Sequence, residues 1–183
     1  MFVPECHVDT ALSRLLLADH LTLINHQQGI TKVAKVLELQ ATAGRGPRFV
    51  IGVVDNDKKF ASNKYLLTFN KVIADRSGPG VTCCYRIYQQ AVQPMHFLIV
   101  LNPACDQWIF EAAQAAHLDL ASFGLPVTLS GFLGVTKKET AKTSEPLRNL
   151  LYAIRRAQPA AYEELADFVS KVIDPESKLW RQF

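Results

Sequence analysis

The chain has no long hydrophobic run. None of its apolar stretches approaches the roughly 18 residues that a membrane-spanning helix requires, so we expect no contact with a membrane. No basic segment precedes an apolar one near the N-terminus, and an acid, Glu5, stands where a secretory signal would be apolar. These absences lead us to expect a cytoplasmic protein.

Cysteine is also scarce, with four in 183 residues. Cys6, Cys83, Cys84 and Cys105 have neither the spacing of a disulfide framework nor a C-x₂-C zinc pattern, so we expect free thiols. The sequence also lacks the phosphate-binding pattern of ATPases and any tyrosine motif suited to a covalent topoisomerase intermediate. Hydrolysis by activated water is therefore favoured over strand passage.

The composition is that of an ordinary globular domain, with 49% hydrophobic and 20% charged residues. The net charge of +3 is unevenly distributed, because residues 32–76 hold nine basic residues and four acids. A basic field around a few acids suits a polyanion such as nucleic acid. Solvated helix faces explain the same charges equally well, and the sequence leaves both explanations open.

Two acidic clusters follow apolar runs. Glu5 comes directly after residues 2–4, and Asp55 and Asp57 come directly after the β-branched run at residues 49–54. Buried parallel strands have this pattern, and ligands bind at the carboxyl ends of such strands. If the two strands are neighbours, about 4.8 Å apart, the carboxylates converge. The cation that suits such an oxygen cluster is Mg²⁺, or Mn²⁺ in its place.

The alternation of strand and helix patterns predicts an α/β fold with a doubly wound, mostly parallel sheet and helices on both faces. Residues 1–117 form the predicted core, and residues 118–183 a C-terminal helical extension packed on it within a single domain. The segments predicted as strands are residues 2–5, 21–25, 49–54, 81–89 and 97–101. Those predicted as helices include residues 30–41, 106–117 and 160–173, with residues 58–75 partly helical.

The two motifs together resemble the TOPRIM domain. That family has a Glu after its first strand, often as Glu-Gly-x-x-Asp, and an Asp-x-Asp after a later strand; here the motifs read Glu5-Cys6-His7-Val8-Asp9 and Asp55-Asn56-Asp57. The resemblance covers residues 1–117 and points to small standalone TOPRIM-like nucleases and relatives of the OLD-type nucleases. It implies a TOPRIM/Rossmann-like fold, Mg²⁺ held by Asp55 and Asp57, and Glu5 as general acid or base or as a further ligand.

Many members of this family place another acid after a later strand, and two candidates are present. We expect Asp106 to cap a helix, as we do Asp9. Glu111 falls on an otherwise apolar helix face, where a carboxylate usually has a partner or a chemical role. We therefore predict Glu111 as a metal ligand or as a residue that positions one.

Phosphate and nucleic-acid binding is predicted for four residues near the motifs. His7 lies inside the first motif, and His26 follows the predicted strand at residues 21–25. Lys58 and Lys59 follow the second motif directly. Histidines suit proton transfer or phosphate contact, and lysines neutralise phosphate, although simple exposure to solvent explains each of the four as well.

The function predicted from these residues is a Mg²⁺-dependent phosphodiester hydrolase, nuclease-like, that acts on nucleic acid. The alternative is a catalytically silent TOPRIM-like module that binds nucleic acid, a partner protein or a second copy of the chain. Cys6 in place of the family's glycine and Pro4 in a predicted central strand favour this alternative. A small-molecule phosphatase stays open, whereas a phosphoacceptor receiver domain expects a lysine where Asn102-Pro103 follows Leu101.

Overall fold

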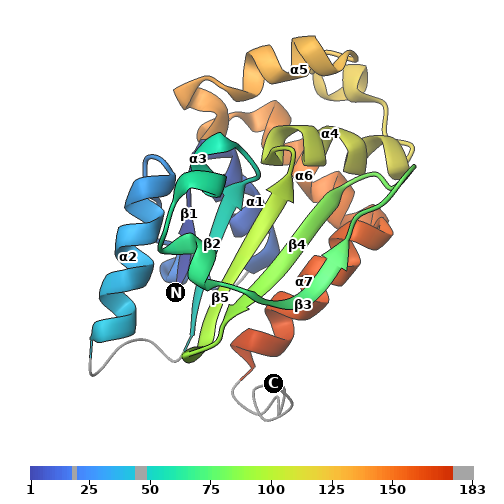
Figure 1. Ribbon diagram of the computed structural model, residues 1–183. Helices are drawn as coiled ribbons and strands as arrows, with labels where there is room; N and C mark the ends of the chain where they lie inside the picture. Colours follow the sequence, from blue (N-terminus) through green and yellow to red (C-terminus); the bar gives the residue numbers. More distant parts are fainter. Residues whose placement is uncertain (18–19, 44–48, 175–183) are drawn as a thin grey trace.

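A computed structural model describes residues 1–17, 20–43 and 49–174 (Figure 1). The strands are β1 (Phe2–Pro4), β2 (Val50–Asp55), β3 (Lys71–Arg76), β4 (Cys84–Gln90) and β5 (Gln93–Asn102). The α-helices are α1 (His7–Leu17), α2 (Ile30–Thr42), α3 (Lys58–Ser62), α4 (Cys105–Ala115), α5 (Leu129–Thr136), α6 (Glu145–Ala157) and α7 (Ala160–Ile173). Short 3₁₀ helices are η1 (Leu21–Leu23), η2 (Leu66–Thr68), η3 (Leu120–Phe123) and η4 (Glu139–Thr143).

The strands form one mixed sheet in the order β1-β2-β5-β4-β3. β1, β2 and β5 are parallel, whereas β4 pairs antiparallel with both β5 and β3. The predicted doubly wound, mostly parallel sheet of the TOPRIM/Rossmann-like type is therefore wrong. A parallel connection needs a crossover of about a dozen or more residues. Only Ala91 and Val92 separate β4 from β5, so these strands form a hairpin.

Two local predictions are also wrong. Residues 21–25 form the helix η1 and a single parallel bridge between Ile24 and Phe2, not a strand. Residues 71–76, read as part of a helical segment, form the edge strand β3, in which Val72 stays exposed. A stripe of apolar residues at helical spacing did not predict the structure here, because the segment pairs with β4.

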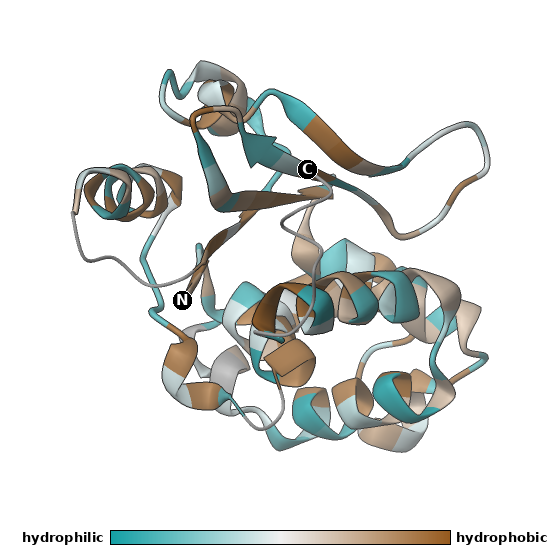
Figure 2. Cartoon of the chain, turned by 90° about the horizontal axis from the view of Figure 1, so that it is seen from below, coloured by the Kyte–Doolittle hydropathy of each residue, from teal (hydrophilic) through white to brown (hydrophobic). Residues whose placement is uncertain are grey.

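Helices cover both faces of the sheet. On one face, α2 packs Val33 and Leu37 against β2, where Gly52 lets the helix approach closely: a Cβ at that position would lie 3.0 Å from Leu37 Cδ1. On the other face lie α1, α4, α6 and α7. Figure 2 shows this larger group of helices on one side of the sheet and α2 apart from it. The carboxyl ends of β1, β2 and β5 are left at one edge, between the helix layers.

The C-terminal helices share the core of the sheet. The ring of Phe168 on α7 meets that of Phe97 on β5, with centroids 5.4 Å apart, and Phe110 on α4 meets Phe132 on α5 at 5.6 Å. Leu150 and Ile154 of α6 are fully buried in the same hydrophobic cluster. No helix in the described part of the chain is both long enough and apolar enough to cross a membrane.

Candidate functional site

Glu5 and Asp55 meet at the carboxyl ends of β1 and β2. The parallel register pairs Pro4 with Val53, and the Glu5 N–H donates to the Val53 carbonyl at 3.0 Å. Glu5 directly follows β1 and Asp55 is the last residue of β2, and the Asp55 N–H lies 3.4 Å from Glu5 Oε2. The Glu5 carboxyl group thus lies beside the backbone of Asp55, fifty residues away in sequence, because their strands are neighbours, and its charge acts on the Asp55 carboxyl group.

The start of α4 completes the surroundings of Asp55. β5 lies beside β2, so the turn after β5 brings α4 to the same edge, and the Cys105 N–H donates to Asp55 Oδ1 at 2.8 Å. Asp106 follows directly, and its charge acts on Asp55. Asp106 Oδ1 accepts from the Gln107 N–H at 2.9 Å.

Asp9 adds a fully buried carboxyl group on α1. Its Oδ2 accepts from the Cys6 N–H at 2.9 Å, while the Asp9 N–H donates to Cys6 Sγ at 3.4 Å. This reciprocal pair resembles a capping box and fixes the start of α1. Asp9 Oδ1 is buried and has no hydrogen-bond partner in residues 1–17, 20–43 and 49–174. An unsatisfied buried carboxylate oxygen is costly, and a cation or a proton would satisfy it.

Glu5, Asp9, Asp55 and Asp106 together are called the acidic site below. Burial, reinforced by the charge of Asp9, raises the pKa of Glu5 to about 7 and that of Asp55 to about 8. Burial raises the pKa of Asp9 as well. The site therefore resists holding several negative charges at neutral pH unless a cation compensates them.

The second aspartate of the Asp-x-Asp motif has a structural task. Asp57 is the N-cap of α3, and its Oδ1 accepts from the N–H groups of Lys59 at 2.8 Å and Phe60 at 3.0 Å. Its charge contributes to the raised pKa of Glu5, so it lies within electrostatic reach of the acidic site. Lys58 and Lys59 are exposed on α3, directly after the motif.

Glu111 forms its hydrogen bonds outside the acidic site. Its two oxygens accept from the Cys83 N–H at 2.6 Å and from Gln107 Nε2 at 2.8 Å. Cys83 has a positive φ of 54°, so Glu111 anchors the turn that leads into β4. Asp106, which was expected only as a helix cap, is the acid of α4 that lies beside Asp55.

The two predicted histidines lie against each other. The rings of His7 and His26 stack with centroids 4.8 Å apart and an interplanar angle of 19°. His26 Nδ1 is 2.6 Å from Thr10 Oγ1. His7 lines a pocket of about 420 Å³ together with Asp55, Asp106 and Lys137, so one of the histidines faces the acidic site.

The described residues hold no group of three or more His, Cys, Asp or Glu side chains arranged to bind a metal. Mg²⁺ does not require such a group, because it is commonly held by one or two carboxylates with water and substrate phosphate in its other positions. The contact between Glu5 and Asp55, and the unsatisfied oxygen of Asp9, fit this mode of binding.

No family model, curated protein or solved structure matches the chain. Function is therefore inferred from the residues of the acidic site and their surroundings.

Sequence reasoning named Asp106 as a candidate but preferred Glu111, and it missed Thr136 and Lys137. Asp106 follows the end of β5 by four residues, whereas Glu5 directly follows β1. Thr136 and Lys137 at the end of α5 line the same pocket, and Thr136 Oγ1 is 3.4 Å from Asp106 Oδ2. Nothing in the sequence pattern indicates that α5, which is distant in sequence, packs beside the carboxyl ends of the strands.

Proposed function

We propose that the protein is a Mg²⁺-dependent phosphodiester hydrolase, nuclease-like, that acts on nucleic acid at the acidic site. The observation that carries the proposal is the contact of Glu5 with Asp55, with the pKa of each raised by burial and by the neighbouring acid Asp9. Asp55 lines the pocket, and Glu5 lies beside it through the Asp55 N–H. Carboxyl groups that are unstable when charged are a favourable binding place for a divalent cation.

Glu5 and Asp55 are the residues that would hold Mg²⁺ or Mn²⁺. When bound, such an ion polarises a phosphoryl oxygen and stabilises the charge that develops on it. A carboxyl group with a pKa near 7, as Glu5 has, exchanges protons readily at neutral pH and can serve as general acid or base. Lys137, on the wall of the same pocket, supplies a positive charge for a phosphate group.

The choice of nucleic acid as substrate depends on the charges around the site. α3 begins directly after the Asp-x-Asp motif, and Lys58, Lys59 and Lys64 are exposed there. Exposed lysines attract a polyanion and orient it through its phosphates. The likeness of the two motifs to those of TOPRIM domains supports the same chemistry, and kinship with that family is part of this proposal.

Neither sequence feature that favoured a silent module is an obstacle in the structure. Cys6 is not among the non-glycine residues with positive φ, and its sulfur accepts a hydrogen bond at the start of α1. Pro4 is the last residue of β1, at one end of the strand order, where a missing N–H is tolerated. What favours a module that binds nucleic acid without cleaving it is the lack, in the described residues, of a group of three metal-ligating side chains.

The decisive experiment measures cleavage of supercoiled plasmid, single-stranded DNA and single-stranded RNA with Mg²⁺, with Mn²⁺ and with EDTA. We expect metal-dependent cleavage that falls by roughly a hundredfold or more in Glu5→Gln and in Asp55→Asn, because each removes a charge that acts on the metal and the phosphate. Glu163→Gln, at an exposed position on α7, is the matched control and should cleave like the unmodified protein.

Two results would reject the hydrolase. Cleavage that survives unchanged in both Glu5→Gln and Asp55→Asn would place the activity elsewhere. Binding of the same nucleic acids without cleavage under any metal condition would establish the silent module instead.

A further inference from the structure

One face of the sheet is covered only in part. On the side of α2, no helix of the described residues lies over β4 and β3 (Figure 1). Side chains alternate along β4, so Arg86 and Tyr88 point to this side, while Tyr85 and Ile87 belong to the core on the other side. Val72 of β3 pairs with Tyr88 and is 53% exposed. Arg86, Tyr88 and Val72 mark what is called the open face below.

The open face adjoins the acidic site. A small cavity of about 120 Å³ lies where β4 approaches α3. Asn56 and Phe60 line it from the segment that follows Asp55, and Arg86 and Tyr88 line it from β4. The cavity is smaller than the roughly 300–1,000 Å³ of small-molecule sites, so it is a depression in a larger surface rather than a pocket for a whole ligand.

The side chains around this cavity suit unpaired bases. Phe60 and Tyr88 are aromatic and partly exposed. Arg86 is exposed but held in position, because its Nε donates to Asp75 Oδ2 at 3.0 Å and its Nη2 lies 3.4 Å from Ser77 Oγ. The bases of a single strand stack on aromatic side chains and on guanidinium planes. In a duplex the same base faces are hidden within the stack, so these side chains favour a single strand.

The charge around the open face complements a phosphate backbone. Residues 56–90, which contain α3, β3 and β4, hold six basic residues and two acids. Asp57 caps α3, and Asp75 forms a salt bridge within the open face, so both acids are already paired. Lys58 and Lys59 are exposed at the start of α3. This excess of positive charge attracts a polyanion, and it disfavours a second copy of the chain, which would present the same charges.

We propose that the open face binds single-stranded nucleic acid, with a base against Tyr88 and the phosphates along Lys58 and Lys59. The strand passes Asn56 and reaches the acidic site at Asp55. This inference rests on the proposed function in taking nucleic acid as the ligand. It adds which form of nucleic acid is bound and which surface binds it.

The test measures fluorescence anisotropy of four labelled ligands of equal length with the full chain. They are a single-stranded DNA, an RNA of the same sequence, the matching DNA duplex and a DNA backbone without bases. EDTA is present throughout, so that metal-dependent cleavage does not alter the ligand. We expect at least one of the single strands to bind about tenfold or more tightly than the duplex. The comparison of DNA with RNA identifies the preferred sugar.

Tyr88→Leu keeps an apolar side chain on β4 but removes the ring. It should weaken binding of the single strand by about tenfold and leave binding of the strand without bases unchanged, because no base is there to stack. Tyr88→Phe keeps the ring and should bind within about twofold of the unmodified chain. Tyr152→Leu, at an exposed position on α6, is the matched control and should have no effect.

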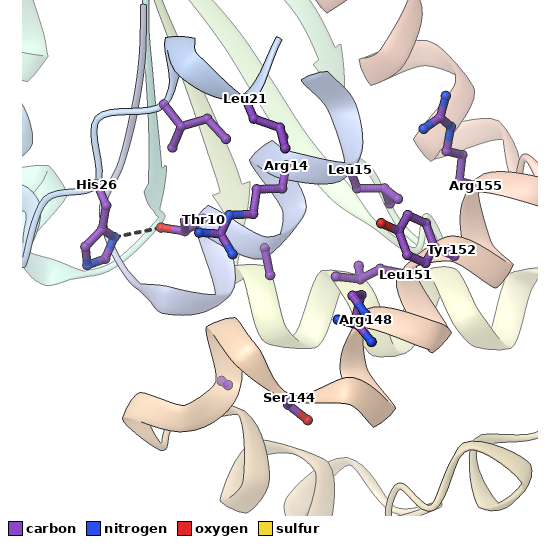
Figure 3. Close-up of a pocket in the computed structure, with 13 residues that line it drawn as sticks. Thr10, Arg14, Leu15, Leu21, His26, Ser144, Arg148, Leu151, Tyr152 and Arg155 are labelled. Carbon is purple, nitrogen blue, oxygen red and sulfur yellow. Dashed lines mark hydrogen bonds between the residues drawn. The ribbon is translucent and has the colours of Figure 1, made fainter. Parts of the chain in front are cut away.

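Lys58→Gln/Lys59→Gln should weaken binding of every strand, including the one without bases. A lysine that neutralises a phosphate of a single strand contributes about 0.7 to the slope of log affinity against log salt concentration, so the slope should fall by about 1.4. Arg155→Gln/Arg156→Gln removes the same charge from α6 on the opposite side of the sheet, where Arg155 and Tyr152 line a separate pocket of about 590 Å³ (Figure 3). This control should leave the slope unchanged. Circular dichroism melts confirm the fold of each variant.

The outcomes separate this proposal from the hydrolase. Glu5→Gln/Asp55→Asn should bind the single strand at least as tightly as the unmodified chain, since the open face is intact and two acids are gone. Binding that depends on Tyr88 in a chain that cleaves nothing would reject the hydrolase alone.

Four results would overturn the present proposal, even if the chain cleaves nucleic acid. They are a duplex that binds as tightly as the single strands, Tyr88→Leu that weakens binding no more than Tyr152→Leu, a salt slope that changes no more in the lysine variant than in the arginine variant, and no binding of any of the ligands.

Discussion

Glu5 and Asp55 are two carboxyl groups whose charged forms are disfavoured in the folded chain. Burial raises their pKa values from 4.5 and 3.8 to about 7 and about 8, so between about pH 4 and pH 8 the folded state binds more protons than the unfolded state. The free energy of unfolding should therefore fall as the pH rises through this window, and level off above it. Urea denaturation between pH 5 and pH 9 measures the slope.

Glu5→Gln/Asp55→Asn should make this dependence shallower, because two of the groups that titrate differently in the folded and unfolded states are gone, while Asp9 remains. Asp167→Asn, an exposed residue on α7, should leave the slope unchanged. Saturating Mg²⁺ at pH 8 should raise the unfolding free energy of the unmodified chain, since a ligand that binds only the folded state stabilises it. A slope that is the same in the double variant would show that neither group titrates abnormally.

We predict that Glu111 stabilises the fold and takes no part in metal binding. Glu111→Ala leaves the Cys83 N–H without its acceptor and should lower the free energy of unfolding by about 1–3 kcal/mol, measured by urea denaturation. Metal-dependent cleavage by the remaining folded protein should stay within about threefold of the unmodified chain, because Glu111 is hydrogen-bonded away from Glu5 and Asp55. A hundredfold loss of cleavage with normal stability would instead make Glu111 a metal ligand, as the sequence had suggested.

At the scale of single elements, substitutions at the start of the short helix α3 can show whether Asp57 is only a helix cap or also a metal ligand. Asp57→Ala removes the N-cap and should destabilise the protein by about 1 kcal/mol, whereas Asp57→Ser keeps a capping oxygen and should be nearly neutral. Thermal melts of the two variants measure the difference. Cleavage should be kept in Asp57→Ser; if it were lost as completely as in Asp55→Asn, Asp57 would be a ligand as well as a cap.

Helices and strands with a clear pattern of hydrophobic residues were predictable from the sequence. α2 and α7 agree closely with their predicted ranges because one apolar stripe of each helix is buried, and β2 agrees because its β-branched run is buried on both sides. β3 was missed because none of its residues is fully buried at the sheet edge, so its apolar residues do not alternate between a buried and an exposed face. The hairpin of β4 and β5 was missed because the turn at Ala91-Val92 lacks glycine and asparagine.

At the scale of the whole molecule, the sheet and the C-terminal helices should unfold together. Phe168→Ala on α7 removes a ring that packs on Phe97 of β5 and should cost about 3–5 kcal/mol. We expect tryptophan fluorescence and far-ultraviolet circular dichroism to report one coincident urea transition, shifted in the variant. Val92→Ala, at the exposed β4–β5 turn, is the control and should change little. Separate transitions for the two probes would show that α7 unfolds independently of the sheet.

The pairing of Glu5 with Asp55 was predictable because two neighbouring parallel strands end at the same edge whatever the rest of the sheet does. The pocket of about 590 Å³ between α1 and α6 was not, because Arg14 and Arg148, which both line it, are far apart in sequence. The hydrophobic pattern of a helix shows which face is buried but not which distant helix packs on it. The sequence therefore indicated the chemistry at the strand ends and gave no sign of this pocket.

The mixed sheet separates the parts of the molecule that carry reactive groups from a part that does not. Every acid of the acidic site belongs to β2 or to the segments that follow β1 and β5, whereas β3 and β4 form a flank beyond β5. Residues 77–83, which join β3 to β4, can therefore change in length or composition without moving those acids, provided that Cys83 keeps its bond to Glu111. This flank is where selectivity can diversify while the reacting groups stay constant.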